Sequence, residues 1–207
     1  MMDMKTAIVT DIRAEKARQT ADWLEENGYR VIRRTAEDPE EAWERLDAEA
    51  VDLLVICVYI EDKGTDGVIG TSHPYDEMLE QVCEKVYEPY DIVEHCLPYL
   101  EKGQGKRIAF LTEKASGITG CEETGAYARH MILAGCNFQA KMLFNRLRPQ
   151  GYTMRCYAAD SEGKDGDGIC AGEYICMNFC YDEKEPYIHS DENRFVMRDK
   201  YFREIQW

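Results

Sequence analysis

Apolar positions along this chain alternate between short continuous runs and longer amphipathic stretches. Residues 6–9 form one apolar run. Residues 14–27 then place alanines and Leu24 on one helical face before Gly28 ends the helix. An Asp38-Pro39 pair is typical of the start of a further short helix. The same pattern predicts strands near 29–32, 53–58, 107–111, 152–157 and 195–197, and helices near 75–100 (bent at Pro89), 123–148 and around 174–179.

The order of these elements predicts the fold class. Residues 53–58 read LLVICV, a continuous apolar run that is typical of a central parallel strand. Strands that alternate with helices form a doubly wound parallel sheet with right-handed crossovers. We therefore predict an α/β, Rossmann-like parallel sheet flanked by helices, in a single domain that spans residues 1–207.

The net charge and the lengths of the apolar runs exclude some classes of binding partner. The net charge is −15, which argues against nucleic acid and anionic membranes as general partners, although a local basic pocket remains compatible with it. The first 31 residues resemble strand and helix rather than a signal peptide. No apolar run reaches the roughly 18 residues of a membrane span. We expect a cytoplasmic protein.

The nine cysteines favour reduced thiols over disulfides or metal ligands. Most fall inside apolar strands or helices, where a thiol behaves as a small hydrophobic group. The one close group is Cys170, Cys176 and Cys180, with no C-x-x-C pair, and the four histidines are scattered. We predict no metal site.

The turn after the first strand carries the most informative departure from a known pattern. A dinucleotide-binding domain opens with T-G-x-x-x-G-x-G, and here the three glycine positions hold Asp11, Glu15 and Ala17. Side chains at these positions block the approach of a pyrophosphate to the backbone, and two carboxylates repel it. Glu15 in the first helical turn would replace the phosphate with the chain's own charge. The pattern predicts a nucleotide-binding fold that has lost the nucleotide.

The whole chain resembles the short-chain dehydrogenase/reductase family. The order and spacing of four segments support the resemblance, although each alone is unspecific. They are residues 51–60 (VDLLVICVYI), 89–114, 137–157 and the ending REIQW.

This resemblance implies an Asn-Ser-Tyr-Lys catalytic tetrad, and only its serine is kept. The four positions hold Lys85, Ser116, Arg129 and Leu133. Ser116 has no recognisable base partner, so we interpret it as a loop serine that caps backbone groups. The loop that shapes the adenine side and the P-G pair after the sixth strand are replaced by residues 56–59 and 159–160, and the substrate lid is shortened.

Two tyrosines are candidates for the acid that the resemblance implies. Tyr59 and Lys63 match Y-x-x-x-K but follow a strand, so we interpret the match as chance. Tyr127 lies two residues before the expected position, which turns its side chain by about 200° from the cleft. Position 131 is Met, so Tyr127 also lacks a lysine four residues later.

Lys85 and Arg129 would place positive charge in the former substrate cleft. A small anion or an acidic segment could bind there. The alternative is that both side chains pair with Glu84, Glu88 or Asp11 and serve packing. Arg33 and Arg34 end the second strand, where relatives that use NADP place basic residues, but we expect them to face acidic neighbours or solvent.

Two functional hypotheses follow. The preferred one is a non-catalytic dehydrogenase-like protein, a pseudoenzyme without a cofactor, that acts as a partner subunit or small-ligand binder. The alternative is a divergent NAD- or NADP-dependent oxidoreductase acting on a small carbonyl or sugar-derived alcohol. The resemblance also implies a homodimer, or a heterodimer with an intact dehydrogenase, through the helices near 75–100 and 123–148. Apolar residues there are Met78, Val82, Val86, Ile92, Leu97, Met131, Phe138, Met142 and Leu143.

Overall fold

The strands form one seven-stranded sheet in the order β2-β1-β3-β4-β5-β6-β7. The computed structural model describes residues 4–35, 38, 40–44, 46, 48–58, 60, 75–158, 193–199 and 203–207. Neighbouring strands are parallel except for β7, which is antiparallel to β6. The strands are β1 (Thr6–Val9), β2 (Arg30–Arg33), β3 (Leu53–Cys57), β4 (Arg107–Thr112), β5 (Thr153–Ala158), β6 (Met197–Arg198) and β7 (Glu204–Ile205).

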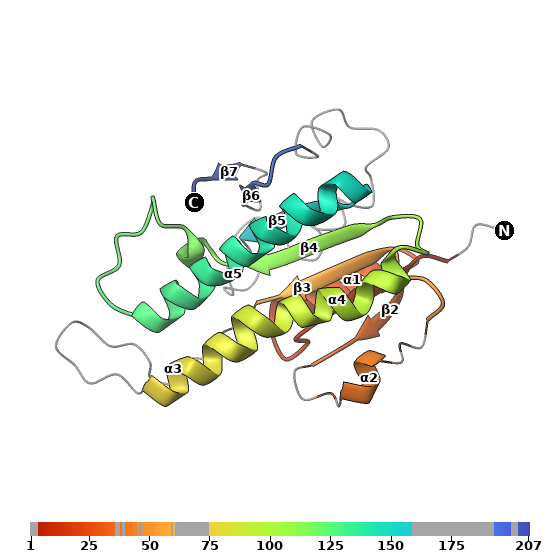
Figure 1. Ribbon diagram of the computed structural model, residues 1–207, viewed down its shortest axis with the longest axis horizontal. Coiled ribbons are helices and arrows are strands. Elements are labelled where there is room, and N and C mark those ends of the chain that lie inside the picture. The colour runs from red at the N-terminus through yellow and green to blue at the C-terminus, as the bar shows by residue number, and fades with distance from the viewer. Residues whose placement is uncertain are drawn as a thin grey trace.

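Helices cover both faces of this sheet (Figure 1). Helix α1 packs on one face, and α4 and α5 pack side by side on the other. The helices are α1 (Glu15–Glu26), α2 (Glu40–Glu44), α3 (Tyr75–Val82), the π-helical turn η1 (Cys83–Tyr87), α4 (Glu88–Leu100), the short 3-10 turn η2 (Lys114–Ser116), α5 (Tyr127–Leu147) and a second 3-10 turn, η3 (Arg148–Gln150).

Successive side chains of each strand point to opposite faces of the sheet, and each face carries one half of the core. In β3, Leu54 and Ile56 face α4 and α5, whereas Leu53 and Val55 face α1. All five residues of β3 are buried, as expected for a strand covered on both faces. The predicted doubly wound fold is thus confirmed in its sheet, its order of elements and its two helical layers.

The long helix predicted near 75–100 contains a π-helical turn immediately before Pro89. Proline has no amide hydrogen, so Pro89 cannot donate to the carbonyl of Lys85 four residues earlier. The thiol of Cys136 on α5 donates to that carbonyl instead, at 2.7 Å. The sequence indicated a bend at Pro89, and the structure places a π turn there that α5 stabilises.

The end of the sheet differs most from the prediction. The strand expected near 195–197 is a two-residue strand, β6, and an additional antiparallel strand, β7, follows it. Strands of two residues are too short to show a periodicity of two. The predicted loop at 160–168 and the helix around 174–179 lie outside the described residues. None of the described helices is long and apolar enough to cross a membrane.

Candidate functional site

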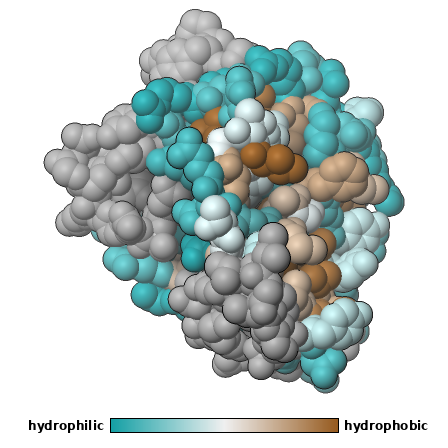
Figure 2. Space-filling view, turned by 90° about the vertical axis from the view of Figure 1, so that its left-hand side faces the viewer, coloured by the Kyte–Doolittle hydropathy of each residue, from teal (hydrophilic) through white to brown (hydrophobic). Residues whose placement is uncertain are grey.

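A small cavity opens where the direction of the sheet order changes, between β1 and β3. In open α/β sheets, ligands bind at the carboxyl ends of the strands at this switch point. The cavity lies between the ends of β1 and β3, the short helix α2 and the η1–α4 segment. It is lined by Thr10, Asp11, Thr35, Trp43, Ile56, Cys57, Val58, Glu84, Lys85, Glu88, Pro89 and Ile92. Figure 2 looks onto the end of the molecule where α3 and α5 begin, and it shows apolar residues gathered in a strip between hydrophilic ones.

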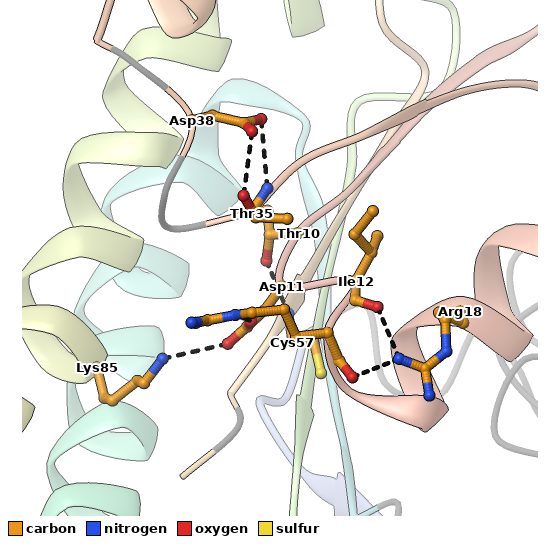
Figure 3. Close-up of polar contacts among 9 residues, drawn as sticks. Thr10, Asp11, Ile12, Arg18, Thr35, Asp38, Cys57 and Lys85 are labelled. Atoms are coloured by element: carbon orange, nitrogen blue, oxygen red, sulfur yellow. Dashed lines mark hydrogen bonds and ion pairs between the residues drawn. The ribbon is translucent and has the colours of Figure 1, made fainter. Parts of the chain in front are cut away.

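The turn after β1 keeps the backbone conformation for which glycine is generally used. Asp11 has a φ of 49°, in the left-handed region that Asp tolerates better than most residues. The amide of Ala14 donates to the carbonyl of Asp11 at 2.9 Å. The Arg18 guanidinium donates to the carbonyls of Ile12 and Arg13, which fixes the turn on α1 (Figure 3).

The Asp11 carboxylate is buried and bridged by two cations rather than aimed at a ligand. Arg13 Nε donates to Asp11 Oδ1 at 2.9 Å, and Lys85 Nζ donates to Asp11 Oδ2 at 3.2 Å. Lys85 reaches Asp11 from the π-helical turn, and both residues are more than nine-tenths buried (Figure 3). The pairing of Lys85 with Asp11 is the alternative that the sequence left open.

A second buried carboxylate, Glu113, directly follows β4 and is also bridged by two cations. Lys16 in the first turn of α1 donates to Glu113 Oε1 at 3.4 Å. Arg129 in the first turn of α5 donates to Glu113 Oε2. Lys16 and Glu113 are each 4% exposed. Neither residue could be identified from the sequence, because they lie 97 positions apart and neither belongs to a known motif. The one available signal was a lysine beside the alanines of the apolar face of α1.

Among the residues that the structure describes, the others predicted at the site have no contact that points to a ligand. The hydroxyl of Ser116 is buried and donates to the carbonyl of Glu113 at 2.6 Å, as a capping serine does. Leu133 and Ala17 are fully buried in the core. Glu15 is exposed and accepts a hydrogen bond from Gln19, so it does not fill the phosphate position with its charge. Tyr59 and Lys63 lie outside the described residues.

Cys57 is the last residue of β3 and is buried. Burial raises the pKa of its thiol to about 12, and the charges of Lys16, Asp11, Glu113 and Lys85 all act on it. Cys96 and Cys136 are buried, whereas Cys83 is exposed. Among the described residues, no group of three or more histidine, cysteine or acidic side chains could hold a metal ion. The group of Cys170, Cys176 and Cys180 lies outside them.

Arg33, which ends β2, and Arg34, which follows it, have different surroundings. Arg33 pairs with Asp22 and Glu25 on α1, and these partners raise its pKa against the effect of burial. Arg34 lies 3.7 Å from Asp38, donates to the carbonyl of Ala42 and stacks over Trp43. Both therefore face acidic neighbours, as expected, and Arg34 lies beside a wall of the cavity.

Comparison with known proteins relates this geometry to a family of structures. No family model matches the sequence, and no curated protein matches it. A carbonyl reductase from Pseudomonas aeruginosa in complex with NADP has a TM-score of 0.75 at 9% identity, covering 99% of this chain and 100% of that one. A protein described as a short-chain dehydrogenase/reductase from Burkholderia multivorans, with bound NADP, has a TM-score of 0.74 at 12% identity, covering 99% and 100%. The chain has the fold of the short-chain dehydrogenases and reductases. The carbonyl reductase Sniffer of Drosophila melanogaster gives 0.72 at 12% identity, covering 99% of each chain.

The prediction that this chain has no cofactor is contradicted by the same comparison. Two chains that share the short-chain dehydrogenase fold over nearly their whole length hold NADP. The prediction rested on two carboxylates repelling a pyrophosphate. In the structure, Asp11 is neutralised by Arg13 and Lys85, and Glu15 is exposed on α1. Filled glycine positions therefore do not by themselves exclude a dinucleotide.

Proposed function

We propose that this protein is a divergent NAD(P)-dependent oxidoreductase of the short-chain dehydrogenase type, acting on a small carbonyl or a sugar-derived alcohol. The cavity at the switch point supports this proposal most strongly. It occupies the place in the sheet at which α/β folds bind nucleotides.

The lining of the cavity matches the parts of a nucleotide. Trp43, Ile56 and Ile92 offer an apolar wall against which a base can pack. The carboxylates of Glu84 and Glu88 can accept hydrogen bonds from ribose hydroxyls. Lys85 lies beside the turn after β1 and supplies positive charge on the phosphate side. The residues present therefore fit a bound dinucleotide.

The bound cofactor would supply or accept a hydride at the carbonyl carbon. The protein's own contribution would be electrostatic. Arg129 occupies the position that the resemblance gives to the acid/base tyrosine, and it is half-buried. A guanidinium keeps its proton near neutral pH, so Arg129 would stabilise negative charge on the substrate oxygen rather than protonate it. The proton would then come from water.

One observation favours a second candidate, a protein that binds the dinucleotide without turnover. Leu133 is fully buried among Ile132 and Cys136, at the position that the resemblance gives to the catalytic lysine. Arg129 is already paired with Glu113. A cofactor-responsive binding protein would need the cavity but no group that transfers a proton.

We also propose that two copies pair through α3–η1 and α5. Six large apolar side chains on these helices are exposed. Single exposed apolar residues are normal on a protein surface, whereas a group of this size marks an interaction site. The six are Tyr75, Leu79, Tyr87, Met131, Phe138 and Met142. Some apolar residues of these helices were expected to face the sheet, and Ile92 and Leu143 do so in the core.

Turnover and binding, measured together, test the proposed function. Purified protein is incubated with NADPH or NADH and a panel of small aldehydes, ketones and oxidised sugars, and nucleotide absorbance is followed. The proposal predicts cofactor oxidation that Arg129→Leu lowers and that Arg146→Leu, on the same helix, leaves unchanged. Binding without turnover on any substrate would favour the second candidate. The absence of both would contradict both.

A further inference from the structure

The π-helical turn η1 contributes to one wall of the cavity at the switch point. Lys85 lies within this turn, Glu88 and Pro89 directly follow it, and all three residues line the cavity. The amide of Glu88 donates to the carbonyl of Cys83, five residues earlier, as in a π-helix. The course of the backbone through this turn therefore decides where these side chains lie, and π turns are frequent at functional sites.

The turn is attached to α5 at the carbonyl of Lys85. Pro89 has no amide hydrogen to donate to this carbonyl, as a residue of a regular α-helix would. The thiol of Cys136 on α5 donates to it at 2.7 Å. Cys136 is 2% exposed, and burial raises the pKa of its thiol to about 12. The thiol therefore keeps its proton near neutral pH and remains a donor.

Gly135 allows α5 to come close enough to η1 for this hydrogen bond. A Cβ atom at Gly135 would lie 3.3 Å from Cγ2 of Val86, which is tighter than an ordinary van der Waals contact. Glycine in the interior of a helix is destabilising relative to alanine, so the close approach of η1 gives a reason for it here. Gly135 and Cys136 together thus hold η1 against α5.

Lys85 connects this attachment to the turn after β1. Its carbonyl accepts from Cys136, and its ammonium group donates to the Asp11 carboxylate at 3.2 Å (Figure 3). Lys85 and Asp11 both line the cavity, and both are buried. A shift of the Lys85 backbone would therefore move its ammonium group relative to Asp11 and to the cavity.

We propose that Cys136 is a positioning residue for the cavity, because its thiol holds the π-helical turn against α5 so that Lys85 meets Asp11 at the cavity wall. Cys136 is not part of the described lining of the cavity, so it acts through Lys85. The feature that matters is the hydrogen-bond donor rather than the volume of the sulfur. This inference deepens the proposed function and rests on the dinucleotide site at the switch point.

A double-mutant cycle between Lys85 and Asp11 tests this role without any cofactor. Urea unfolding gives the coupling between the two side chains in wild type and in the variants Cys136→Ala, Cys136→Val and Cys136→Ser. Alanine removes the donor and the sulfur, valine removes the donor but fills the space, and serine keeps a donor. Cys96→Ala is the matched control, because Cys96 is fully buried but lies further along the chain on α4.

We expect the coupling to fall below about half of its wild-type value in Cys136→Ala and Cys136→Val, and to be kept in Cys136→Ser and Cys96→Ala. NADPH titration of the same cysteine variants, with Lys85 and Asp11 unchanged, gives a second readout. Affinity should fall by about tenfold in the two variants without a donor, the scale of one lost hydrogen bond to a charged group, and should be kept in the other two. The valine variant decides the question if the alanine variant does not fold.

The outcomes separate this role from the proposed function. A coupling near zero in wild type, or one that is unchanged in Cys136→Ala and Cys136→Val, would overturn the role of Cys136. An equal loss in Cys136→Ser or Cys96→Ala would also overturn it, since packing would then be responsible. Equal NADPH affinity in all variants would overturn it and leave the cofactor proposal standing. A wild type that binds no NADPH would contradict the proposed function, and the coupling would then decide the role of Cys136.

Discussion

Lys85 Nζ donates to Asp11 Oδ2 at 3.2 Å, which joins the π-helical turn η1 to the turn after β1. The two residues are 74 positions apart in the chain, and both line the cavity at the switch point. The carboxylate that should have repelled a phosphate is therefore paired with one of the cations that could attract it. This contact explains how an acidic residue can occupy a glycine position without presenting an unpaired charge.

Breaking this ion pair should destabilise the fold. Lys85→Met leaves Asp11 buried with Arg13 as its remaining partner, so we expect a loss of about 1–3 kcal/mol in the free energy of unfolding, below the full cost of an unpaired buried charge. Lys85→Met/Asp11→Asn should recover most of that loss. Urea unfolding of the wild type, both single variants and the double variant measures the coupling. A coupling energy near zero would mean that the pair contributes nothing to stability.

A close approach between the turn after α4 and β3 should make Gly103 intolerant of any side chain. A Cβ atom at Gly103 would lie 1.9 Å from the carbonyl oxygen of Val51, a backbone atom that cannot move without shifting β3. Gly103→Ala should cost more than about 2 kcal/mol, at the upper part of the range for overpacking. Gly120→Ala is the matched control, since a Cβ there meets nothing within 4 Å. Thermal unfolding of the two variants checks the difference.

The raised pKa of Glu88 should make the free energy of unfolding fall as the pH rises. Its pKa is raised, first by burial and further by Glu84 and Asp11, while Lys85 opposes the rise. The native state therefore keeps a proton on Glu88 at pH values where the unfolded chain, with a carboxyl pKa of about 4.3, has lost it. Stability from this group is fully present below the unfolded pKa and is lost as pH rises through the folded pKa.

Glu88→Gln should therefore raise the melting temperature at pH 7, by about 1–3 °C for a chain of this size. The advantage over wild type should disappear near pH 4. Glu80→Gln, at an exposed position on α3, is the control and should show no such dependence. The idea fails if the Glu88→Gln variant melts below wild type at pH 7 and above it at pH 4.

A charge in the exposed apolar surface of α5 should separate the proposed dimer. Phe138 is 69% exposed, and Phe138→Glu would place a carboxylate between the paired helices. Sedimentation velocity should give twice the chain mass for wild type and the chain mass for the variant. Ile118→Glu changes a side chain that is 76% exposed but lies outside the helices, and it should remain dimeric. A wild-type protein that sediments as a monomer would exclude the dimer.

The elements that bury an apolar face could be predicted from the sequence because their periodicity is local. The run at Leu53–Cys57 and the alanine face of α1 indicated β3 and α1 directly. Pro89 indicated where the helix is irregular, because the missing amide hydrogen of proline is a local property of the sequence. The two-residue strands β6 and β7 carry no such period and were misjudged or missed.

The candidate site could be predicted only in part, because its contacts join distant residues. Lys85 and Arg129 were identified through the family resemblance, but their partners were not determined by it. The pair of Lys16 with Glu113 depends on the ends of β1 and β4 lying at one edge of the sheet. The repulsion of a phosphate by Asp11 was therefore overestimated, since its carboxylate was counted without the two cations that pair with it.

Titration with NADPH, followed by nucleotide fluorescence, tests the central claim that a dinucleotide binds in the cavity at the switch point. Wild type is compared with Trp43→Leu, which alters the apolar wall, and with Trp23→Leu on α1, which does not line the cavity. We predict binding by wild type and Trp23→Leu, a stabilisation of about 2.7 kcal/mol at 100 times the dissociation constant, and binding weakened about tenfold or more in Trp43→Leu. The absence of any response of wild type to millimolar NADPH and NADH, or equal affinity in all three proteins, would contradict the account.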